Sequence, residues 1–262
     1  MKGARDAEAR RLWMRELWID PYAFDAVRFA RERLGWAPDT VQANVLNETK
    51  KRVILNWGRQ SGKSTVAAAK MVHLAVTMPG AVCVWMSANK EHTAEVFAKM
   101  EGFLLRLGIT ATGQRGKQMA RVLPNGSRLL GLAARDATVR SYTAHLVVID
   151  EGAQVADSVY DAVMPLLAVN NGILWVLGTP RGKLGRFYEI WERGDEREWL
   201  KSLRKTSECG RVTAEFLESE RRVKGEAILK REYECEFMED GLNLLKDEHV
   251  HRLFRRNWDK EE

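Results

Sequence analysis

Residues 52–72 read RVILNWGRQSGKSTVAAAKMV, and this stretch changes character part-way along. Its first five residues have the apolar composition of a buried strand, and the run from Ser64 onward has the composition of a helix. Between them lies a short turn bracketed by Gly58 and Gly62. The stretch therefore predicts a strand, a tight turn and a helix, and the chemistry of the turn decides what it holds.

The turn GRQSGKST carries two glycines, a lysine and two hydroxyl groups. Backbone N–H groups at such a turn can wrap a phosphate, because glycine lets the chain close around the anion. Lys63 is expected to reach the outer phosphates and the Ser64 hydroxyl to ligate magnesium. One feature departs from the usual motif, since Trp57 stands at the position of its first glycine. The pattern predicts a P-loop for ATP and Mg²⁺, with Gly58, Arg59, Gln60, Ser61, Gly62, Lys63, Ser64 and Thr65 as nucleotide-binding residues.

A second acidic element follows at the end of an apolar strand, in the stretch LVVIDE. Asp150 is expected to hold magnesium, and Glu151 to polarise the water that attacks the terminal phosphate. Thr179 ends a further apolar stretch, GILWVLGTP, where it either contacts the γ-phosphate or attacking water or caps a turn before Pro180. Together these residues favour nucleotide hydrolysis.

Outward from the turn, strand-like and helix-like segments alternate. Strands are expected at 52–56 and 81–87, helices at 64–77 and 90–107, a hairpin across 121–132 and a helix capped by Asp20 that stops at Gly35. This alternation predicts an α/β fold, a P-loop NTPase of the ASCE type with a mainly parallel sheet flanked by helices and a small C-terminal helical subdomain. The expected division is an N-terminal helical segment at 1–50, an ATPase core at 51–205 and a helical subdomain at 206–262.

Composition narrows the class of protein. The 262 residues are 45% hydrophobic and 30% charged, which is typical of a folded globular protein. No apolar stretch approaches the length of a membrane span, and the N-terminus lacks the apolar core of a signal peptide. Three scattered cysteines fit neither a disulfide framework nor a zinc site, and the net charge of +6 permits a polyanionic partner without indicating one.

These elements, in this order, resemble the ATPase domain of the large terminase subunit, the DNA-packaging motor of tailed bacteriophages. The turn GRQSGKS looks like the terminase variant of the P-loop, which implies that Arg59 reaches the γ-phosphate. By the same resemblance Gln42 stands like an adenine-reading glutamine, Asp150 and Glu151 match the acidic pair, and Thr179 in LGTPRG matches the coupling motif. Arg140 stands where the family carries an arginine proposed to enter a neighbouring subunit's site. The stretch KREYECEF, residues 230–237, resembles the segment that closes the family's ATPase region.

The resemblance implies that ATP hydrolysis drives double-stranded DNA into a procapsid in the host cell cytoplasm. The implied partners are the portal protein and the small terminase subunit, with a homo-oligomeric ring on the procapsid and a monomer in dilute solution. DNA contacts are expected among clustered basic residues near the hairpin, Arg115, Lys117, Arg121 and Arg128. No nuclease activity is expected, because the sequence after Phe237 is too short for the family's nuclease domain.

Two other functions stay open on the sequence. A helicase-like or other nucleic-acid translocating ATPase shares the acidic pair, but a two-lobed helicase needs a second lobe, for which about 80 residues after Thr179 are too few. A non-hydrolysing, nucleotide-dependent assembly protein would keep Lys63 but would have no use for a placed Glu151 and Arg140.

Overall fold

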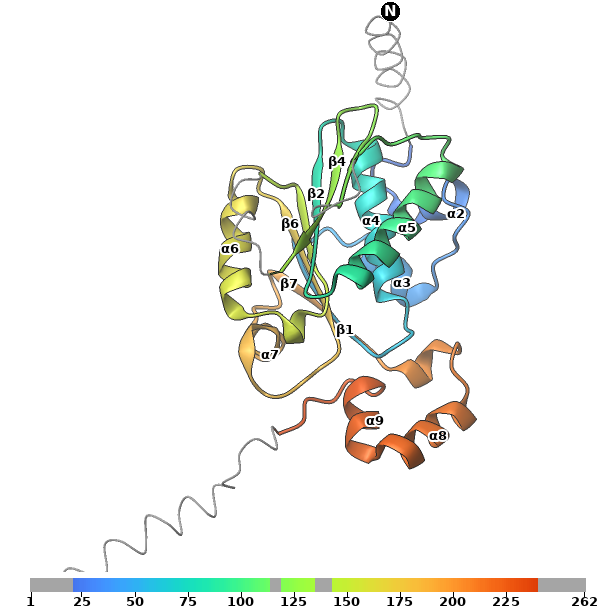
Figure 1. Ribbon diagram of the computed structural model, residues 1–262, viewed down its shortest axis with the longest axis vertical. Coiled ribbons are helices and arrows are strands. Elements are labelled where there is room, and N and C mark those ends of the chain that lie inside the picture. Colours follow the sequence, from blue (N-terminus) through green and yellow to red (C-terminus); the bar gives the residue numbers. More distant parts are fainter. Residues whose placement is uncertain (1–20, 114–118, 135–142, 240–262) are drawn as a thin grey trace, which may run out of the picture.

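The computed structural model describes residues 21–113, 119–134 and 143–239, and these residues form a seven-stranded sheet with helices on both faces (Figure 1). The strand order is β3-β4-β2-β5-β6-β1-β7. All neighbouring strands are parallel except β3 and β4, which form an antiparallel hairpin. The strands are β1 (Arg52–Trp57), β2 (Val82–Ser87), β3 (Met119–Val122), β4 (Arg128–Ala133), β5 (Leu146–Ile149), β6 (Ile173–Gly178) and β7 (Trp199–Arg204).

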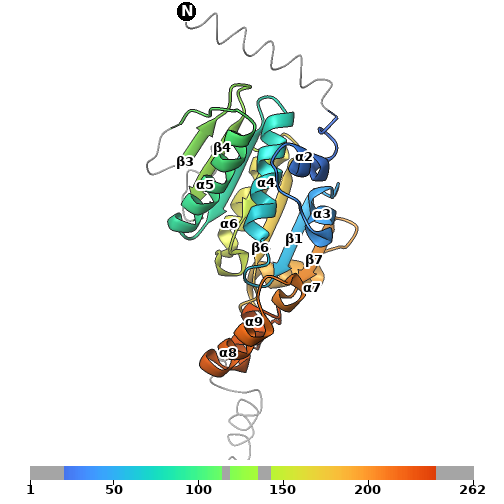
Figure 2. The same ribbon diagram turned by 90° about the vertical axis from the view of Figure 1, so that its right-hand side faces the viewer.

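The helices divide between the two faces of the sheet (Figures 1 and 2). One face carries α2 (Ala26–Glu32), α3 (Thr40–Leu46), α4 (Lys63–Thr77) and α5 (Lys90–Arg106). The other carries α6 (Asp157–Ala168) and α7 (Gly185–Arg193), and two short 3-10 turns, η2 (Gly152–Gln154) and η3 (Thr206–Cys209), follow β5 and β7. The last helices of the described residues are α8 (Ala214–Lys224) and α9 (Glu226–Glu232). They lie together, at the end of the sheet toward which β1 points (Figure 2).

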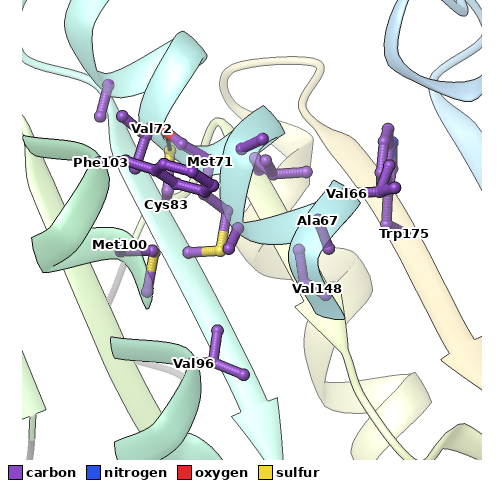
Figure 3. Close-up of a cluster of buried hydrophobic side chains, with 14 of the residues drawn as sticks. Val66, Ala67, Met71, Val72, Cys83, Val96, Met100, Phe103, Val148 and Trp175 are labelled. Carbon is purple, nitrogen blue, oxygen red and sulfur yellow. Dashed lines mark hydrogen bonds between the residues drawn. The ribbon is translucent and has the colours of Figure 1, made fainter. Parts of the chain in front are cut away.

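Successive side chains of each central strand point to opposite faces of the sheet, so they belong to two separate hydrophobic cores. In β6, Trp175 and Leu177 join the core beneath α4 and α5, whereas Leu174 and Val176 join the core beneath α6 and α7. Figure 3 shows part of the first core, where Met71 of α4 and Phe103 of α5 gather with Cys83 of β2. Strands apolar on both faces are expected in a parallel sheet covered by helices on each side.

The predicted α/β fold is confirmed, and its topology places the functional strands. β6 lies between β1, which carries the P-loop, and β5, which carries the acidic pair. The hairpin is also confirmed, with its turn at Asn125 and Gly126 between β3 and β4.

Two local predictions were wrong. The predicted cap Asp20 lies outside the described residues, and within them the helix that was expected to start there begins only at Ala26, because the carboxylate of Asp25 accepts a hydrogen bond from the backbone amide of Arg28 and caps it there. The sequence after residue 191 turns polar and was expected to be helical, but its stretch WLKSLR forms the edge strand β7. Its polar character suits a strand that is paired on one side only.

The helices α8 and α9 lie in the region predicted to form a helical subdomain, and that subdomain as a unit stays a prediction. The boundaries at residues 50 and 205 stay a prediction. On the N-terminal side, Leu46 of α3 belongs to the same buried core as α4.

Candidate nucleotide-binding and hydrolysis site

A cavity of about 330 Å³ opens at the carboxyl edge of the sheet, where β1, β5 and β6 end. The register pairs Asn56 with Gly178 and Ile149 with Val176, so the three strands end close to one another. Every P-loop residue from Arg59 to Thr65 lines the cavity, together with His92, Glu95, Lys99, Asp150, Glu151, Gln154, Gly178, Thr179 and Arg211. The topology thus brings the predicted phosphate loop and the predicted acidic pair into one site.

The P-loop turns into α4 at Gly62, whose φ of +90° is the left-handed conformation that glycine adopts without strain. Lys63 is the first residue of α4 and folds back over the loop. Its Nζ donates hydrogen bonds to the carbonyl oxygens of Trp57, at 2.6 Å, and Gly58, at 2.9 Å. Burial lowers the pKa of Lys63 to about 8, against the opposing charge of Asp150. The amine therefore lies over the loop, held by two carbonyl groups.

The departure at Trp57 has a packing explanation. The Trp57 side chain is fully buried, and its indole Nε1 donates a hydrogen bond to the hydroxyl of Ser202 in β7 at 2.9 Å. The glycine that follows is required by close backbone contact. A Cβ at Gly58 would lie 2.3 Å from the Thr206 hydroxyl and 2.5 Å from the Tyr233 carbonyl oxygen. The first glycine of this variant loop thus serves contact with the C-terminal segment.

A buried polar network supports the loop from below. Gln42 is fully buried; its Nε2 donates to the Ser61 carbonyl at 3.4 Å, and its Oε1 accepts from the Asp39 backbone amide at 3.1 Å. Arg204 donates to the same Ser61 carbonyl and pairs with the Asp39 carboxylate at 2.7 Å. In this structure the Gln42 amide is engaged in supporting the P-loop, and its role as an adenine contact stays a prediction.

Sequence reasoning missed Asp39 and Arg204. Burial of the Asp39 carboxyl opposes its ionisation, but hydrogen bonds from Arg204 and from the Gln42 amide outweigh burial and hold the pKa of Asp39 below its ordinary value. A capping aspartate three residues before Gln42 was a visible signal for the start of α3. Nothing in the sequence signalled that Arg204, 165 residues later, would pair with it.

Asp150 and Glu151 come directly after β5 and differ in environment. Asp150 is buried, which raises its pKa to about 6, although the Glu151 backbone amide and the Lys63 charge favour its ionised form. Glu151 has a left-handed backbone conformation, with φ of +54°. Such a conformation is strained for a residue with a Cβ and often marks a functional site. It places the Glu151 carboxylate 3.1 Å from Nδ1 of His92.

His92, in the first turns of α5, is a further site residue that the sequence did not single out. It lines the cavity and contacts the residue predicted to activate water. A signal was available, because α5 follows β2 and begins at the same carboxyl edge as the P-loop.

Thr179 follows β6 and lines the main cavity between the acidic pair and the P-loop. It also lines a neighbouring cavity of about 240 Å³, together with Gln154, Pro180, Arg181, Arg231 and Glu232. Thr179 and Gln154 thus separate the predicted hydrolysis site from a space bounded by α9.

Arg59 lines the cavity but extends toward α9. Its Nε pairs with the Glu232 carboxylate at 2.6 Å, and its backbone amide donates to the Glu232 carbonyl at 2.9 Å. The side chain of Arg59 is 62% exposed. Its predicted contact with the γ-phosphate would require it to leave Glu232.

Several predicted residues fall outside the site or outside the described residues. Arg140, Arg115 and Lys117 lie outside the described residues. Arg121, expected among the DNA contacts, is buried, pairs with Glu101 of α5 and lies over the Phe97 ring. Its guanidinium is therefore poorly placed for DNA, whereas Arg128 is exposed.

Comparison with protein families identifies the chain. Residues 54–252 match the family described as terminase large subunit, T4likevirus-type, N-terminal. The chain belongs to this family. The terminase large subunit of Thermus phage G20c is 31% identical over 184 residues, covering 62% of this chain and 38% of that protein, and that of Thermus virus P23-45 is 32% identical with the same coverage. The chain thus spans well under half the length of these terminase relatives.

Solved terminase structures share the fold. The Thermus phage P74-26 large terminase ATPase domain superposes with a TM-score of 0.71 at 24% identity, covering 79% of this chain and 96% of that one. The HK97 bacteriophage large terminase superposes with a TM-score of 0.66 at 16% identity, covering 81% of this chain and 54% of that one. The bacteriophage D6E large terminase in complex with ADP superposes with a TM-score of 0.64 at 14% identity, covering 76% of this chain and 53% of that one. The resemblance inferred from the motifs is confirmed.

The described residues also bear on metal-ion sites and membrane spans. No group of three or more His, Cys, Asp or Glu side chains there is arranged to hold a metal ion. A P-loop site needs no such group, because magnesium there is held by a hydroxyl, a carboxylate and substrate phosphates. No helix among the described residues is long and apolar enough to cross a membrane.

Proposed function

We propose that this chain is the ATP-hydrolysing motor domain of a viral large terminase. One observation carries the proposal: Lys63 in the turn after β1, Glu151 after β5 and Thr179 after β6 line a single cavity, and these three strands are neighbours in the sheet. Family membership supports the same function, because the matched family is the N-terminal region of the terminase large subunit.

The residues fit ATP and magnesium. The P-loop offers backbone amides at the start of α4. Among the described residues, the hydrogen bonds of the Lys63 amine go to two carbonyls of the loop, which a phosphate can replace. Ser64 and Asp150 supply the hydroxyl and carboxylate oxygens that would hold Mg²⁺. When bound, the ion neutralises charge on the phosphates. The D6E large terminase was solved with ADP, which supports nucleotide binding in this fold.

Glu151 is the proposed general base. Its carboxylate orients the attacking water and accepts its proton, and His92 holds that carboxylate in the cavity at 3.1 Å. Thr179, which lines the same cavity, is proposed to contact the γ-phosphate or the attacking water. The proposed stabilisers of charge on the transferred phosphoryl group are Arg59 within the chain and Arg140 from a neighbouring subunit.

In the assembled motor, hydrolysis would drive double-stranded DNA into a procapsid. The proposed partners are DNA, the portal protein, the small terminase subunit and further copies of this chain in a ring. The isolated chain is proposed to be a monomer in dilute solution and to act in the host cell cytoplasm, since the relatives are viral proteins.

The first test compares the wild-type protein with Glu151→Gln in steady-state ATP hydrolysis with magnesium. We expect turnover to fall by about a hundredfold or more, because the amide cannot accept the proton. ATP affinity should stay within about twofold of wild type, because Glu151 does not belong to the phosphate loop. A Lys63→Ala variant is the contrasting control and should lose ATP affinity itself.

The same experiment separates this function from its rivals. A non-hydrolysing assembly protein would bind ATP without turnover in the wild type, and Glu151→Gln would then change nothing. DNA stimulation of turnover would support a nucleic-acid motor, and magnesium-dependent DNA cleavage by the chain would contradict the expectation of no nuclease activity.

A further inference from the structure

A cation that no motif indicated lies against the P-loop. Arg211 lines the main cavity, although it belongs to the segment between η3 and α8, about 150 residues after the P-loop in sequence. A Cβ placed on Gly62 would lie 2.9 Å from Nη1 of Arg211. The guanidinium group is therefore in direct contact with the backbone of the turn that wraps the phosphates.

The segment that carries Arg211 is fixed at both ends. Before it, the buried Thr206 donates its hydroxyl hydrogen to the Arg59 carbonyl at 2.7 Å, and its backbone amide bonds to the Tyr233 carbonyl at 2.8 Å. Gly210 then turns the chain with φ of +62°. After it, the Thr213 hydroxyl accepts a hydrogen bond from the Phe216 amide and caps α8. The P-loop contact of Arg211 thus follows from an anchored segment.

Arg211 differs from the other cationic side chains of the cavity in its partners. Arg59 pairs with Glu232, Lys99 pairs with Glu95, and His92 contacts Glu151. Within the described part of the chain, Arg211 makes no hydrogen bond or ion pair. The positive charge of Arg211 helps to lower the pKa of the Asp39 carboxyl, but that carboxylate is already paired with Arg204.

We propose that Arg211 binds the phosphates of the nucleotide as a second cation beside Lys63. A guanidinium presents a planar fork of donors that matches phosphate oxygens, and here it lies at the phosphate-wrapping turn with its donors unused. This inference rests on the proposed nucleotide site. It adds a consequence for the fold: a bound nucleotide joins the P-loop to the segment leading into α8, at the end of the molecule seen in Figure 2.

The test measures binding of ATP, ADP, adenosine and inorganic tripolyphosphate to the wild type, Arg211→Ala and Arg211→Lys. We expect Arg211→Ala to weaken ATP and tripolyphosphate by about 10- to 100-fold, the loss typical of a hydrogen bond to a charged group. Adenosine binding should not change, and Arg211→Lys should recover part of the affinity for ATP. Arg222→Ala is the matched control, because Arg222 belongs to α8, which follows the segment of Arg211, and its side chain is 73% exposed.

Each other outcome overturns the inference. Unchanged ATP affinity in Arg211→Ala would show that the guanidinium does not contact the nucleotide. An equal loss for adenosine and ATP would show a contact with the base instead of the phosphates. An equal loss in Arg222→Ala would show a general effect of charge. The proposed function is tested separately, since it fails if the wild type does not hydrolyse ATP, whatever the effect of Arg211→Ala on binding.

Discussion

Asp150 is an acid whose surroundings oppose its ionisation. Burial raises its pKa to about 6, while Lys63 and a backbone amide only partly compensate. Because magnesium binds the ionised carboxylate, protons and magnesium compete for Asp150. The protein is therefore expected to lose magnesium affinity as the pH falls through about 6, which is a higher pH than for an exposed aspartate.

This competition predicts how magnesium binding depends on pH. Below a pH of about 6, the apparent magnesium affinity of the ADP-loaded protein should fall by about tenfold per pH unit, as one proton is taken up per ion released. The measurement is a magnesium titration at pH 5, 6 and 7, with the same titration of free ADP subtracted. An affinity that follows free ADP alone down to pH 5 would rule out Asp150 as the ligand, and Asp150→Asn should show no such extra dependence.

At the scale of residues, the sequence predicted those side chains whose place in the site follows from their position in a short motif. Lys63 and Ser64 are adjacent to the turn, and Asp150 ends its strand, so their placement follows from local structure. His92, Arg204 and Arg211 belong to no such motif. The start of α5 at the carboxyl edge was an available signal for His92, but the contacts that the three residues make join positions far apart in the chain, and no local pattern encodes those contacts.

At the scale of elements, alternation of apolar residues and glycine positions was sufficient to predict most strands and helices. It failed for β7, because an edge strand buries less and its sequence WLKSLR has no continuous apolar run. Yet β7 matters for the site. It pairs with β1 along the whole strand and ends at Arg204, which supports the P-loop.

The surroundings of two glycines predict opposite effects on stability when each is replaced by alanine. Gly58 lies at the contact between the P-loop and the C-terminal segment, and Gly102 does not. Gly58→Ala should destabilise the fold by about 1–3 kcal/mol, the usual cost of overpacking, because its Cβ would overlap Thr206 and the Tyr233 backbone. Gly102→Ala is the matched control. Gly102 lies in α5 with no atom within 4 Å of its Cβ position, so alanine should stabilise the helix by about 0.5–1 kcal/mol.

Chemical denaturation measures both changes. Gly58→Ala should also weaken ATP binding, since relief of the overlap moves the P-loop. A Gly58→Ala protein as stable as wild type would contradict the packing explanation for the displaced glycine of this variant motif.

At the scale of the whole molecule, the C-terminal segment connects parts of the carboxyl edge. The Cys235 carbonyl accepts a hydrogen bond from Asn56 of β1 at 3.2 Å, and Phe237 packs on Tyr188 of α7, with ring centroids 5.0 Å apart. Glu232 holds Arg59. A nucleotide that drew Arg59 away from Glu232 would therefore act on α9 and on the neighbouring cavity at Thr179.

The ring proposed for the assembled motor predicts that the site is shared between subunits. Turnover per subunit should then rise with protein concentration, because Arg140 of one copy completes the site of the next. Glu151→Gln and Arg140→Ala should each be inactive alone. Mixed in equal amounts, they should recover activity, because about one interface in four of a head-to-tail ring would combine an intact Glu151 with a neighbour's intact Arg140.

The results would show whether Arg140 acts in the site of a neighbouring subunit or Arg59 acts within its own. Turnover that is flat with concentration, with Arg140→Ala fully active and Arg59→Ala inactive, would contradict the shared site and leave Arg59 as the arginine that acts within its own subunit. ATP hydrolysis would stand in that case, because Lys63, Asp150 and Glu151 come from one chain. Recovery in the mixture can arise only if groups from two copies meet at one phosphate, so it would place the catalytic unit at the boundary between subunits.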